Sequence, residues 1–277
     1  MDGGVGRALE PVLAMWPLVR ARARSLCGLV LREDQSYLLT RLEPVARQLN
    51  FPSLALFISA TLAGGKPELD RALVEALTTH ETSFYRDPAF WEVMRTKVLP
   101  DIIGKLDKGR PLRFWSAASS TGQEAYSFAI TMSDWFPNVT YEGWATDVAE
   151  DTLERATRGI FTNAEIERGM PQGMLGKHFD RHAVGWQAKS YLRSPFRFDK
   201  FNLLGQAAPL GTFDVVMCRN VLVYFDADDR NTVIERLVKS LTPRGWLGLG
   251  STELPTASQK NLLRLPDGAG WMHRQMP

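Results

Sequence analysis

The chain has 277 residues, of which 44% are hydrophobic, enough for one sizeable domain with an extra module or for two modest domains. The 33 Lys and Arg residues and 31 Asp and Glu residues give a formal net charge of +2, and this net charge does not indicate nucleic-acid binding. Two cysteines are too few for a disulfide framework, and four histidines without metal-ligand spacing predict no metal site.

The N-terminal region contains one apolar run, "PVLAMWPLV" at 11–19, followed by the basic cluster "RARAR" at 20–24. A signal peptide has its basic residues before the apolar run, and a membrane span needs about 20 apolar residues. No other segment approaches that length. We therefore expect a cytoplasmic protein.

Residues 6–77 have the pattern of an all-helical module. The segments "SYLLTRLEPVARQL" and "PSLALFISATL" place apolar residues three and four apart, as one face of a helix requires. Ser36 and Pro52–Ser53 are typical helix starts, and Pro67 begins a further helix within the loop region 63–70.

After residue 78 the pattern changes to strands separated by helical stretches. Such alternation predicts an α/β fold with a parallel sheet and crossover helices. The expected strands are 112–117, 141–147, 213–220 and 245–251. The expected helices begin near Gly122, at "AEDTLERATR" and at "DADDRNTVIERLVKSL". Asp267–Gly268 separates two short strand-like runs and predicts a terminal hairpin.

Residues 172–200 fit this alternation less well. They are rich in aromatic and β-favouring side chains, with Pro195 near the middle of the run "WQAKSYLRSPFRFDKF". We interpret this stretch as short antiparallel strands inserted as a small lobe.

The first predicted strand of the α/β part ends in small residues, "SAASSTG" at 116–122. Small side chains allow a sharp turn and the close approach of a ligand at the carboxyl end of the strand. Glu124 in this region suits an ammonium group, and Asp147 at the end of the next strand suits two ribose hydroxyls. S-adenosylmethionine has both groups. Two plainer interpretations stay open: Asp147 caps a helix, and Glu124 complements a helix dipole.

Four separated segments resemble motifs of the CheR-type chemotaxis receptor methyltransferases. They are "LTTHETSFYRD" (77–87), "FWSAASSTGQEAYS" (114–127), "FNLLG" (201–205) and "CRNVLVYFD" (218–226). Order and spacing match too, and the resemblance runs from about residue 20 to the end. It implies an enzyme that transfers a methyl group from S-adenosylmethionine to glutamate side chains on cytoplasmic helices of chemoreceptors. The products are S-adenosylhomocysteine and a glutamate γ-methyl ester.

The resemblance also implies the fold class and the domains. It predicts a Rossmann-like α/β methyltransferase domain over 78–277, preceded by an all-helical domain over 1–77. A small β-subdomain is expected to be inserted at about 172–200.

The same motifs imply the site residues, by position. The implied cofactor-binding residues are His80, Thr82, Arg86, Glu124, Asp147, Asn202, Leu203, Arg219 and Asn220. Arg86 and Tyr224 are implied to face the methyl-transfer region and are the catalytic candidates.

The pattern alone supports plainer alternatives for some of these residues. Arg219 is also explained as a bridge between acidic groups near a strand end. Leu203 and Tyr224 are explained as core residues, as are Val223 and Phe225, because they lie in apolar surroundings.

The chain departs from the family pattern at several places. His80 stands where the family usually has Asn, and Gln123 replaces a common acidic residue. The N-terminal helix that is Arg-rich in the family offers only Arg41 and Arg47, so weaker charge steering toward an acidic receptor is expected. The inserted lobe is short, which predicts that the protein does not depend on a tether to a receptor tail peptide.

Two other functions compete with a receptor methyltransferase. A binding module of the same fold would hold S-adenosylmethionine or S-adenosylhomocysteine as a sensor or scaffold, without transfer. Retention of the site residues disfavours it. A small-molecule methyltransferase is the third possibility, against which the helical module and the lobe favour a macromolecular substrate. No nucleic acid is expected as a partner, and contact with a membrane is expected only through the receptor.

Overall fold

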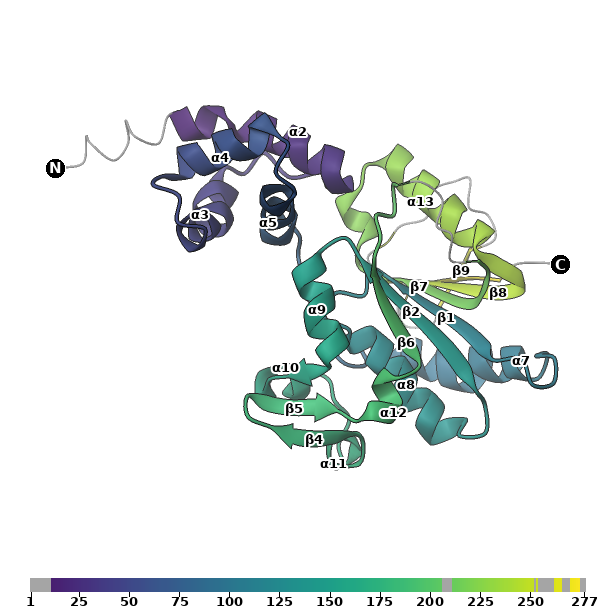
Figure 1. Ribbon diagram of the computed structural model, residues 1–277. Coiled ribbons are helices and arrows are strands. Elements are labelled where there is room, and N and C mark those ends of the chain that lie inside the picture. The colour runs from purple at the N-terminus through teal and green to yellow at the C-terminus, as the bar shows by residue number, and fades with distance from the viewer. Residues whose placement is uncertain (1–10, 206–210, 252, 254–261, 266–269, 275–277) are drawn as a thin grey trace. The chain divides into compact units, whose positions relative to one another are not determined.

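The computed structural model describes residues 11–205, 211–251, 253, 262–265 and 270–274 (Figure 1). The chain divides into two compact units. One comprises Met1–Thr79 with Tyr224–Asp226, and the other comprises His80–Val223 with Ala227–Pro277. Within these described ranges, no helix is both long and apolar enough to cross a membrane.

The first unit is helical, as its sequence pattern predicts. Its elements are α2 (Trp16–Cys27), the π-helical turn η1 (Leu38–Leu42), α3 (Glu43–Gln48), α4 (Leu54–Ala63) and α5 (Pro67–Leu77). Ser53 caps α4, since its hydroxyl accepts a hydrogen bond from the Leu56 N–H, and Pro67 begins α5. Arg22 links α2 to α5 through bonds of 2.7 and 2.8 Å to both carboxylate oxygens of Asp70.

The main sheet of the second unit has seven strands in the order β6-β2-β1-β7-β8-β10-β9. Their bounds are β1 (Leu112–Ala117), β2 (Tyr141–Asp147), β6 (Phe196–Lys200), β7 (Phe213–Cys218), β8 (Leu241–Leu249), β9 (Leu262–Arg264) and β10 (Trp271–Arg274). The first five strands in the spatial order are mutually parallel. β10 runs antiparallel to both of its neighbours, β8 and β9. The predicted parallel α/β sheet is therefore confirmed.

Two of the predicted strands have different bounds in the structure: 213–220 is observed as Phe213–Cys218, and 245–251 as Leu241–Leu249. The last parallel strand begins at Leu241 rather than at 245, because its first residues pair with β7 across a register shift between Phe213 and Val215. The expected terminal hairpin is present as the antiparallel pair of β9 and β10. Its predicted turn, Asp267–Gly268, lies outside the described residues.

The second unit also contains α6 (Pro88–Val93), η2 (Met94–Val98), α7 (Leu99–Ile103), α8 (Gln123–Trp135), α9 (Glu150–Arg158) and α13 (Ala227–Lys239). Of these, α8 packs on the main sheet through aromatic contacts. Phe114 of β1 stacks on Phe128 of α8 with ring centroids 3.8 Å apart. Both rings are fully buried, so this contact anchors α8 against the first strand.

A small second sheet is inserted between β2 and β6 (Figure 1). Its elements are β3 (Ile160–Phe161), α10 (Asn163–Glu167), α11 (Met174–His178), β4 (Phe179–His182), β5 (Gly185–Ala188) and α12 (Ser190–Arg193). The order β3-β5-β4 is antiparallel, as expected for the lobe. The three-stranded sheet begins and ends earlier than 172–200, because Phe196–Lys200 is β6 and pairs with β2.

Candidate active site

Three neighbouring parallel strands end at one edge of the main sheet, and four predicted site residues, Glu124, Asp147, Arg219 and Asn220, lie at or shortly after their ends. β1 ends at Ala117, β2 at Asp147 and β7 at Cys218. Open α/β sheets bind their ligands at the carboxyl ends of such strands. This edge is therefore the candidate active site.

The small-residue turn after β1 has an unusual backbone. Ala118, Ser120 and Gly122 have φ angles of 63°, 50° and 94°. Left-handed conformations are uncommon for residues other than glycine and concentrate at functional sites. The Ser119 N–H holds the turn to β2 through a 2.8 Å bond to the Thr146 carbonyl. The Ser119 hydroxyl is buried and has no hydrogen-bond partner among the described residues.

Asp147 connects this turn to the end of β2. One carboxylate oxygen accepts the Ser120 N–H at 2.9 Å, and the other accepts the Ala149 N–H at 3.1 Å. Burial raises the pKa of Asp147, and the two backbone N–H groups and the nearby His80 offset part of that increase. The N-cap residue of α9 is Ala149 rather than Asp147, so the capping alternative is not found in its simple form.

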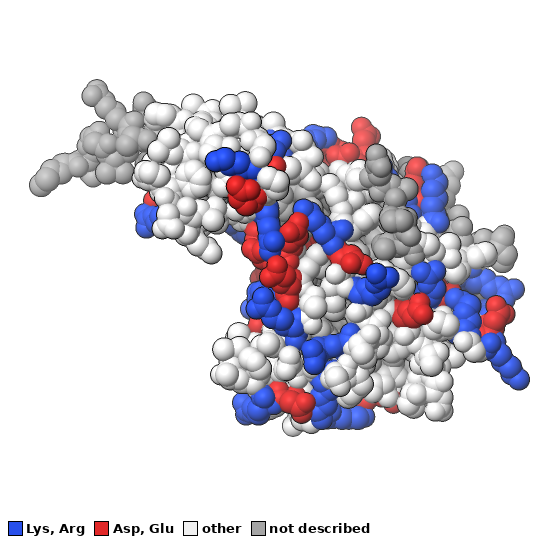
Figure 2. Space-filling model, viewed as in Figure 1, with Lys and Arg blue, Asp and Glu red and all other residues white. Residues whose placement is uncertain are grey.

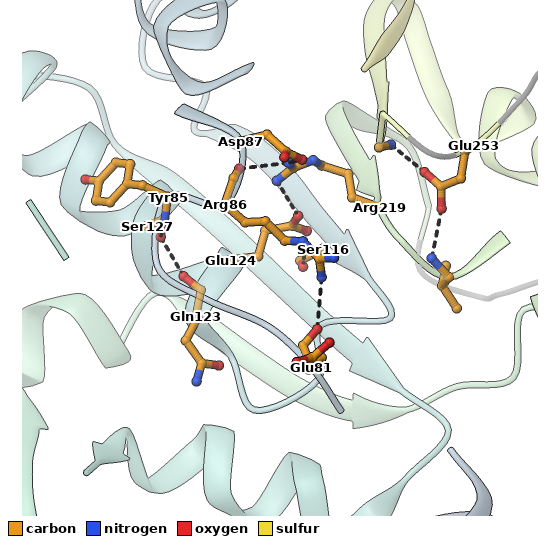
Figure 3. Close-up of polar contacts among 12 residues, drawn as sticks. Glu81, Tyr85, Arg86, Asp87, Ser116, Gln123, Glu124, Ser127, Arg219 and Glu253 are labelled. Atoms are coloured by element: carbon orange, nitrogen blue, oxygen red, sulfur yellow. Dashed lines mark hydrogen bonds and ion pairs between the residues drawn. The ribbon is translucent and has the colours of Figure 1, made fainter. Parts of the chain in front are cut away.

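Glu124 lies in the first turn of α8 and points at the end of β1 (Figure 3). One carboxylate oxygen accepts the Ser116 hydroxyl at 2.7 Å, and the other pairs with Nη1 of Arg219 at 3.3 Å. Burial raises its pKa, while Arg219 and Ser116 act in the opposite direction. Its place in the first turn of α8 agrees with the helix-dipole interpretation, and its role toward an ammonium group stays a prediction.

Arg219, the first residue after β7, connects three segments. Nη2 donates to Asp87 Oδ2 at 2.5 Å and to the Arg86 carbonyl at 2.8 Å, and Nη1 reaches Glu124 (Figure 3). The guanidinium carbon lies 4.2 Å from the centre of the Phe90 ring. The side chain is 2% exposed. Arg219 thus forms the bridge between acidic groups that its pattern allowed.

The first motif, 80–87, runs along the same edge. The His80 carbonyl accepts the Ser120 hydroxyl at 3.1 Å, and its ring Nδ1 lies 3.2 Å from the Thr152 hydroxyl. The Tyr85 N–H donates to the Ser127 hydroxyl of α8 at 2.9 Å. Tyr85 and Asp87 both have positive φ angles, 48° and 59°. The motif is therefore a strained segment attached to the turn and to α8.

Arg86 and Thr82 are less firmly held within that segment. The Arg86 guanidinium donates to the Glu81 carbonyl at 3.0 Å (Figure 3). Thr82 is half-buried between His80 and the fully buried Phe84. The Arg86 side chain makes no ion pair with the described acidic residues, which leaves its fork available to a carboxylate.

Asn202 and Leu203 follow β6 at the same edge. The Asn202 side chain accepts the Leu204 N–H at 2.9 Å, which closes a local turn. Leu203 is buried, consistent with the core alternative, and its carbonyl accepts a bond from Arg236 at 3.0 Å. The segment is tied to the site by the 2.8 Å bond from the Phe201 N–H to the Asp147 carbonyl.

Tyr224 is not brought together with these residues in one unit. It ends the 3-10 turn η3 (Leu222–Tyr224) and belongs to the helical unit, where its carbonyl accepts the Val30 N–H at 2.9 Å. Its catalytic role stays a prediction. Of its apolar neighbours, Phe225 is buried as expected, but Val223 is 42% exposed, so its assignment to the core is wrong.

Three residues of this edge were missed by the sequence analysis. Asp87 and Ser116 are the partners of Arg219 and Glu124, and both lie inside motifs that had been identified. Glu253 is a buried carboxylate that binds backbone N–H groups after β7 and β8. The motifs themselves could have indicated Asp87 and Ser116, whereas Glu253 carries no local signal.

The polar groups at this edge fit S-adenosylmethionine. The Glu124 carboxylate suits an ammonium group. Each Asp147 oxygen accepts one backbone N–H and keeps a lone pair for a ribose hydroxyl. The buried Ser119 hydroxyl offers one more polar group. Among the described residues, no group of His, Cys, Asp and Glu is arranged to hold a metal ion.

Fold and site together define a Rossmann-like α/β enzyme that binds a nucleoside cofactor at the carboxyl edge of its sheet. Comparison with known proteins gives the family. The model of the CheR methyltransferase, SAM binding domain, matches residues 80–266, which is more than half of the chain.

Curated relatives agree with that match. Chemotaxis protein methyltransferase Cher2 of Pseudomonas putida is 36% identical over 235 residues, covering 82% of this chain and 85% of the relative. Chemotaxis protein methyltransferase 1 of Pseudomonas aeruginosa is 35% identical over 250 residues, covering 87% and 90%. The chemotaxis protein methyltransferase of Vibrio parahaemolyticus is 34% identical, covering 83% and 85%. The chain belongs to the CheR methyltransferase family and is an S-adenosylmethionine-dependent methyltransferase.

Proposed function

We propose that this protein methylates glutamate side chains on the cytoplasmic helices of chemoreceptors, and that it works in the cytoplasm. The observation that carries the proposal is the buried Glu124 carboxylate, held by Ser116 and Arg219 at the sheet edge of a CheR-family chain. The three relatives named above are chemotaxis protein methyltransferases, which supports the receptor as substrate. The organisation into a helical domain over 1–77 and a methyltransferase domain over 78–277 belongs to the same proposal.

The proposed chemistry needs no general base. S-adenosylmethionine, when bound, supplies a methyl group that is activated by the sulfonium charge. A glutamate side chain is deprotonated near pH 7, so its oxygen needs no proton removed before it attacks. Proximity and orientation then supply most of the acceleration, roughly 7–11 kcal/mol in favourable cases.

Different residues at the sheet edge bind different parts of the cofactor. Glu124 binds the ammonium group of the cofactor, and Asp147 binds the ribose hydroxyls. Asn202 and Leu203 flank the adenine, while His80, Thr82, Arg219 and Asn220 line the remaining sides. The turn that carries Ser119 and Ser120 lets the backbone approach the methionine part of the cofactor closely.

Arg86 and Tyr224 are the proposed catalytic residues. The planar guanidinium of Arg86 binds a carboxylate, either that of the cofactor or that of the substrate. The Arg86 guanidinium donates to the Glu81 carbonyl, so a ligand carboxylate displaces a neutral acceptor. Tyr224 orients the acceptor glutamate or the methyl group.

Charge steering toward the receptor is expected to be weak. Arg41 donates to the Thr78 carbonyl at 3.1 Å and stacks over Tyr37, and Arg47 pairs with Glu43 at 2.6 Å. Both arginines of that helix therefore have partners within their own unit. On the face shown in Figure 2, Lys and Arg lie among Asp and Glu, and no broad basic area is visible there. Encounter rates should then depend little on salt.

We also infer that the protein does not depend on a receptor tail peptide. Only Ala183 and Val184 separate β4 from β5, so the hairpin has no long loop to close over a peptide. Titration of the protein with the tail peptide of its own receptors should show no micromolar binding by calorimetry. Micromolar affinity would overturn the inference.

The first test of the function uses methyl-tritiated S-adenosylmethionine and membranes that contain the receptors of the same organism. Receptor bands should acquire label that base releases as volatile methanol, which is the signature of a methyl ester. Membranes stripped of receptors are the control. No label, together with tight S-adenosylhomocysteine binding by calorimetry, would favour a non-catalytic sensor instead.

A further inference from the structure

The chain turns sharply where it leaves β7, and one side chain from elsewhere holds that turn. Glu253 is 1% exposed. Its Oε1 accepts the backbone N–H groups of Val221 at 2.8 Å and Leu222 at 3.0 Å. Its Oε2 accepts the N–H of Gly250, which follows β8. Figure 3 shows Glu253 on the side of Arg219 away from the first motif.

The carboxylate therefore joins the carboxyl ends of two adjacent parallel strands. Cys218 of β7 pairs in register with Leu249 of β8, and the chain after each strand contributes N–H groups to the same side chain. Asn220 adopts a left-handed φ of 61° in this turn. At Gly250 a Cβ atom would lie 3.0 Å from the Asn220 nitrogen and 2.9 Å from Glu253 Oε2. The packing leaves no room for a side chain there.

The turn held by Glu253 presents two residues proposed to bind the cofactor. Arg219 points from it to Glu124 and Asp87, and Asn220 is its left-handed residue. Glu253 also lies near enough to Glu124 for its charge to raise the pKa of that carboxyl. The Glu253 carboxylate accepts its hydrogen bonds from backbone N–H groups, so it acts on the site through the backbone.

We propose that Glu253 is a positioning residue that holds Arg219 and Asn220 in the conformation that binds the cofactor. The proposal rests on the proposed function only for the identity of that cofactor. A carboxylate is required because one oxygen accepts the Val221 and Leu222 N–H groups and the other accepts the Gly250 N–H. Glutamine would place an N–H donor against either the Gly250 N–H or the pair from Val221 and Leu222.

The consequence for binding is a change in population. Without acceptors on both sides, the turn samples other conformations, and only a fraction of the molecules is ready to bind. The apparent dissociation constant rises by the inverse of that fraction. A loss comparable to one unsatisfied buried N–H corresponds to a weakening of about tenfold or more.

The test compares Glu253→Gln with a matched variant, Asp214→Asn. Asp214 is a buried carboxylate at the opposite end of β7, where it accepts the Arg113 N–H at 2.9 Å and pairs with Arg110 at 2.7 Å. Calorimetry with S-adenosylhomocysteine gives the affinity, denaturant unfolding gives the stability, and hydrogen exchange follows the Val221 and Leu222 amides.

We expect Glu253→Gln to weaken S-adenosylhomocysteine binding by about tenfold or more and to accelerate exchange at Val221 and Leu222. Asp214→Asn should lose stability yet bind within about twofold of wild type. Wild-type affinity in folded Glu253→Gln would overturn the proposal, as would equal weakening in both variants.

A further measurement keeps the proposal falsifiable if Glu253→Gln does not fold. In the wild-type protein without ligand, the Val221 and Leu222 amides should exchange as slowly as neighbouring β7 amides. Exchange at the rate of an open loop would overturn the proposal. The readouts for Glu253 are S-adenosylhomocysteine binding and hydrogen exchange, which do not depend on methyl transfer. A wild-type protein that binds S-adenosylhomocysteine but methylates no receptor would refute the proposed function, and the role of Glu253 would still be decided by these readouts.

Discussion

The Arg219 guanidinium and the Glu124 carboxylate, 95 residues apart in the chain, meet at 3.3 Å at the carboxyl edge of the main sheet. Neither is free to move, since Ser116 holds the other oxygen of Glu124 and Asp87 holds the other nitrogen of Arg219. The largely buried Glu124 carboxylate is therefore kept in one orientation by Ser116, by Arg219 and, through Arg219, by Asp87. Such preorganisation is what an ammonium-binding group needs, because little reorganisation accompanies binding.

Glu124→Gln should weaken S-adenosylhomocysteine binding about 100-fold, since a buried carboxylate that pairs with an ammonium group is lost. Arg219 keeps Asp87 as a partner in this variant, so folding should persist. Calorimetry measures the affinity. Ser116→Ala, which removes one neutral donor from the same carboxylate, is the milder comparison, and affinity equal to wild type in Glu124→Gln would place the ammonium group elsewhere.

The pH dependence of stability has a defined sign for the buried carboxyls. Burial raises the pKa of Glu124 above its ordinary 4.5 and that of Asp147 above 3.8. Between these ordinary values and the raised ones, the folded state keeps protons that the unfolded state has released. The contribution of each group to stability is thus complete below its ordinary pKa and is lost as pH rises through the raised value.

Denaturant unfolding between pH 4 and 8 measures this effect. Relative to Glu124→Gln, the wild-type free energy of unfolding should fall by about 1.4 kcal/mol for each unit by which the pKa is raised. Asp134 and Glu165 act oppositely, because their pKa values are lowered and their contributions are lost toward acid. A difference between wild type and variant that does not change with pH would contradict the burial of an ionising Glu124.

Arg86→Ala should reduce receptor methylation about 100-fold, because a misplaced reactant loses most of the benefit of orientation. The kinetic pattern identifies the carboxylate that Arg86 holds. A rise in the KM for S-adenosylmethionine together with weaker S-adenosylhomocysteine binding indicates the carboxylate of the cofactor. A lower kcat with unchanged cofactor binding indicates the substrate. Turnover at the wild-type rate would remove Arg86 from the mechanism.

Asp134→Ala should lower the free energy of unfolding by about 1–3 kcal/mol, since it leaves the polar network around the buried His178 ring incomplete. His178 is fully buried, with Nε2 3.1 Å from Asp134 and Nδ1 2.6 Å from the Tyr191 hydroxyl. Urea unfolding measures the change. Asp180→Ala is the matched control: its 3.9 Å pair with Lys189 is exposed, so about 0.5 kcal/mol or less is expected. Equal losses in the two variants would show that the network adds nothing.

Much of the fold was predictable because its signals are local. The strands 112–117 and 141–147 and the N-terminal helices have periodicities that a short window contains, and the structure confirms them. Phe196–Lys200 was assigned to the inserted lobe instead of the main sheet. Its alternating aromatic pattern suits either sheet, and only the pairing with β2, some 50 residues earlier, decides which one it joins.

The sequence alone was enough to predict the family motifs, the small-residue turn, Glu124 in the helix after the first parallel strand and Asp147 at the end of the second. The tertiary structure alone decided that Arg219 bridges Asp87 and Glu124, and that Glu253 holds the turn after β7. The two kinds of feature differ in the sequence separation of the residues that form them. Periodicity, turn chemistry and motif spacing are encoded over a few neighbouring residues, whereas these hydrogen bonds join segments that come together only when the parallel strands align their ends.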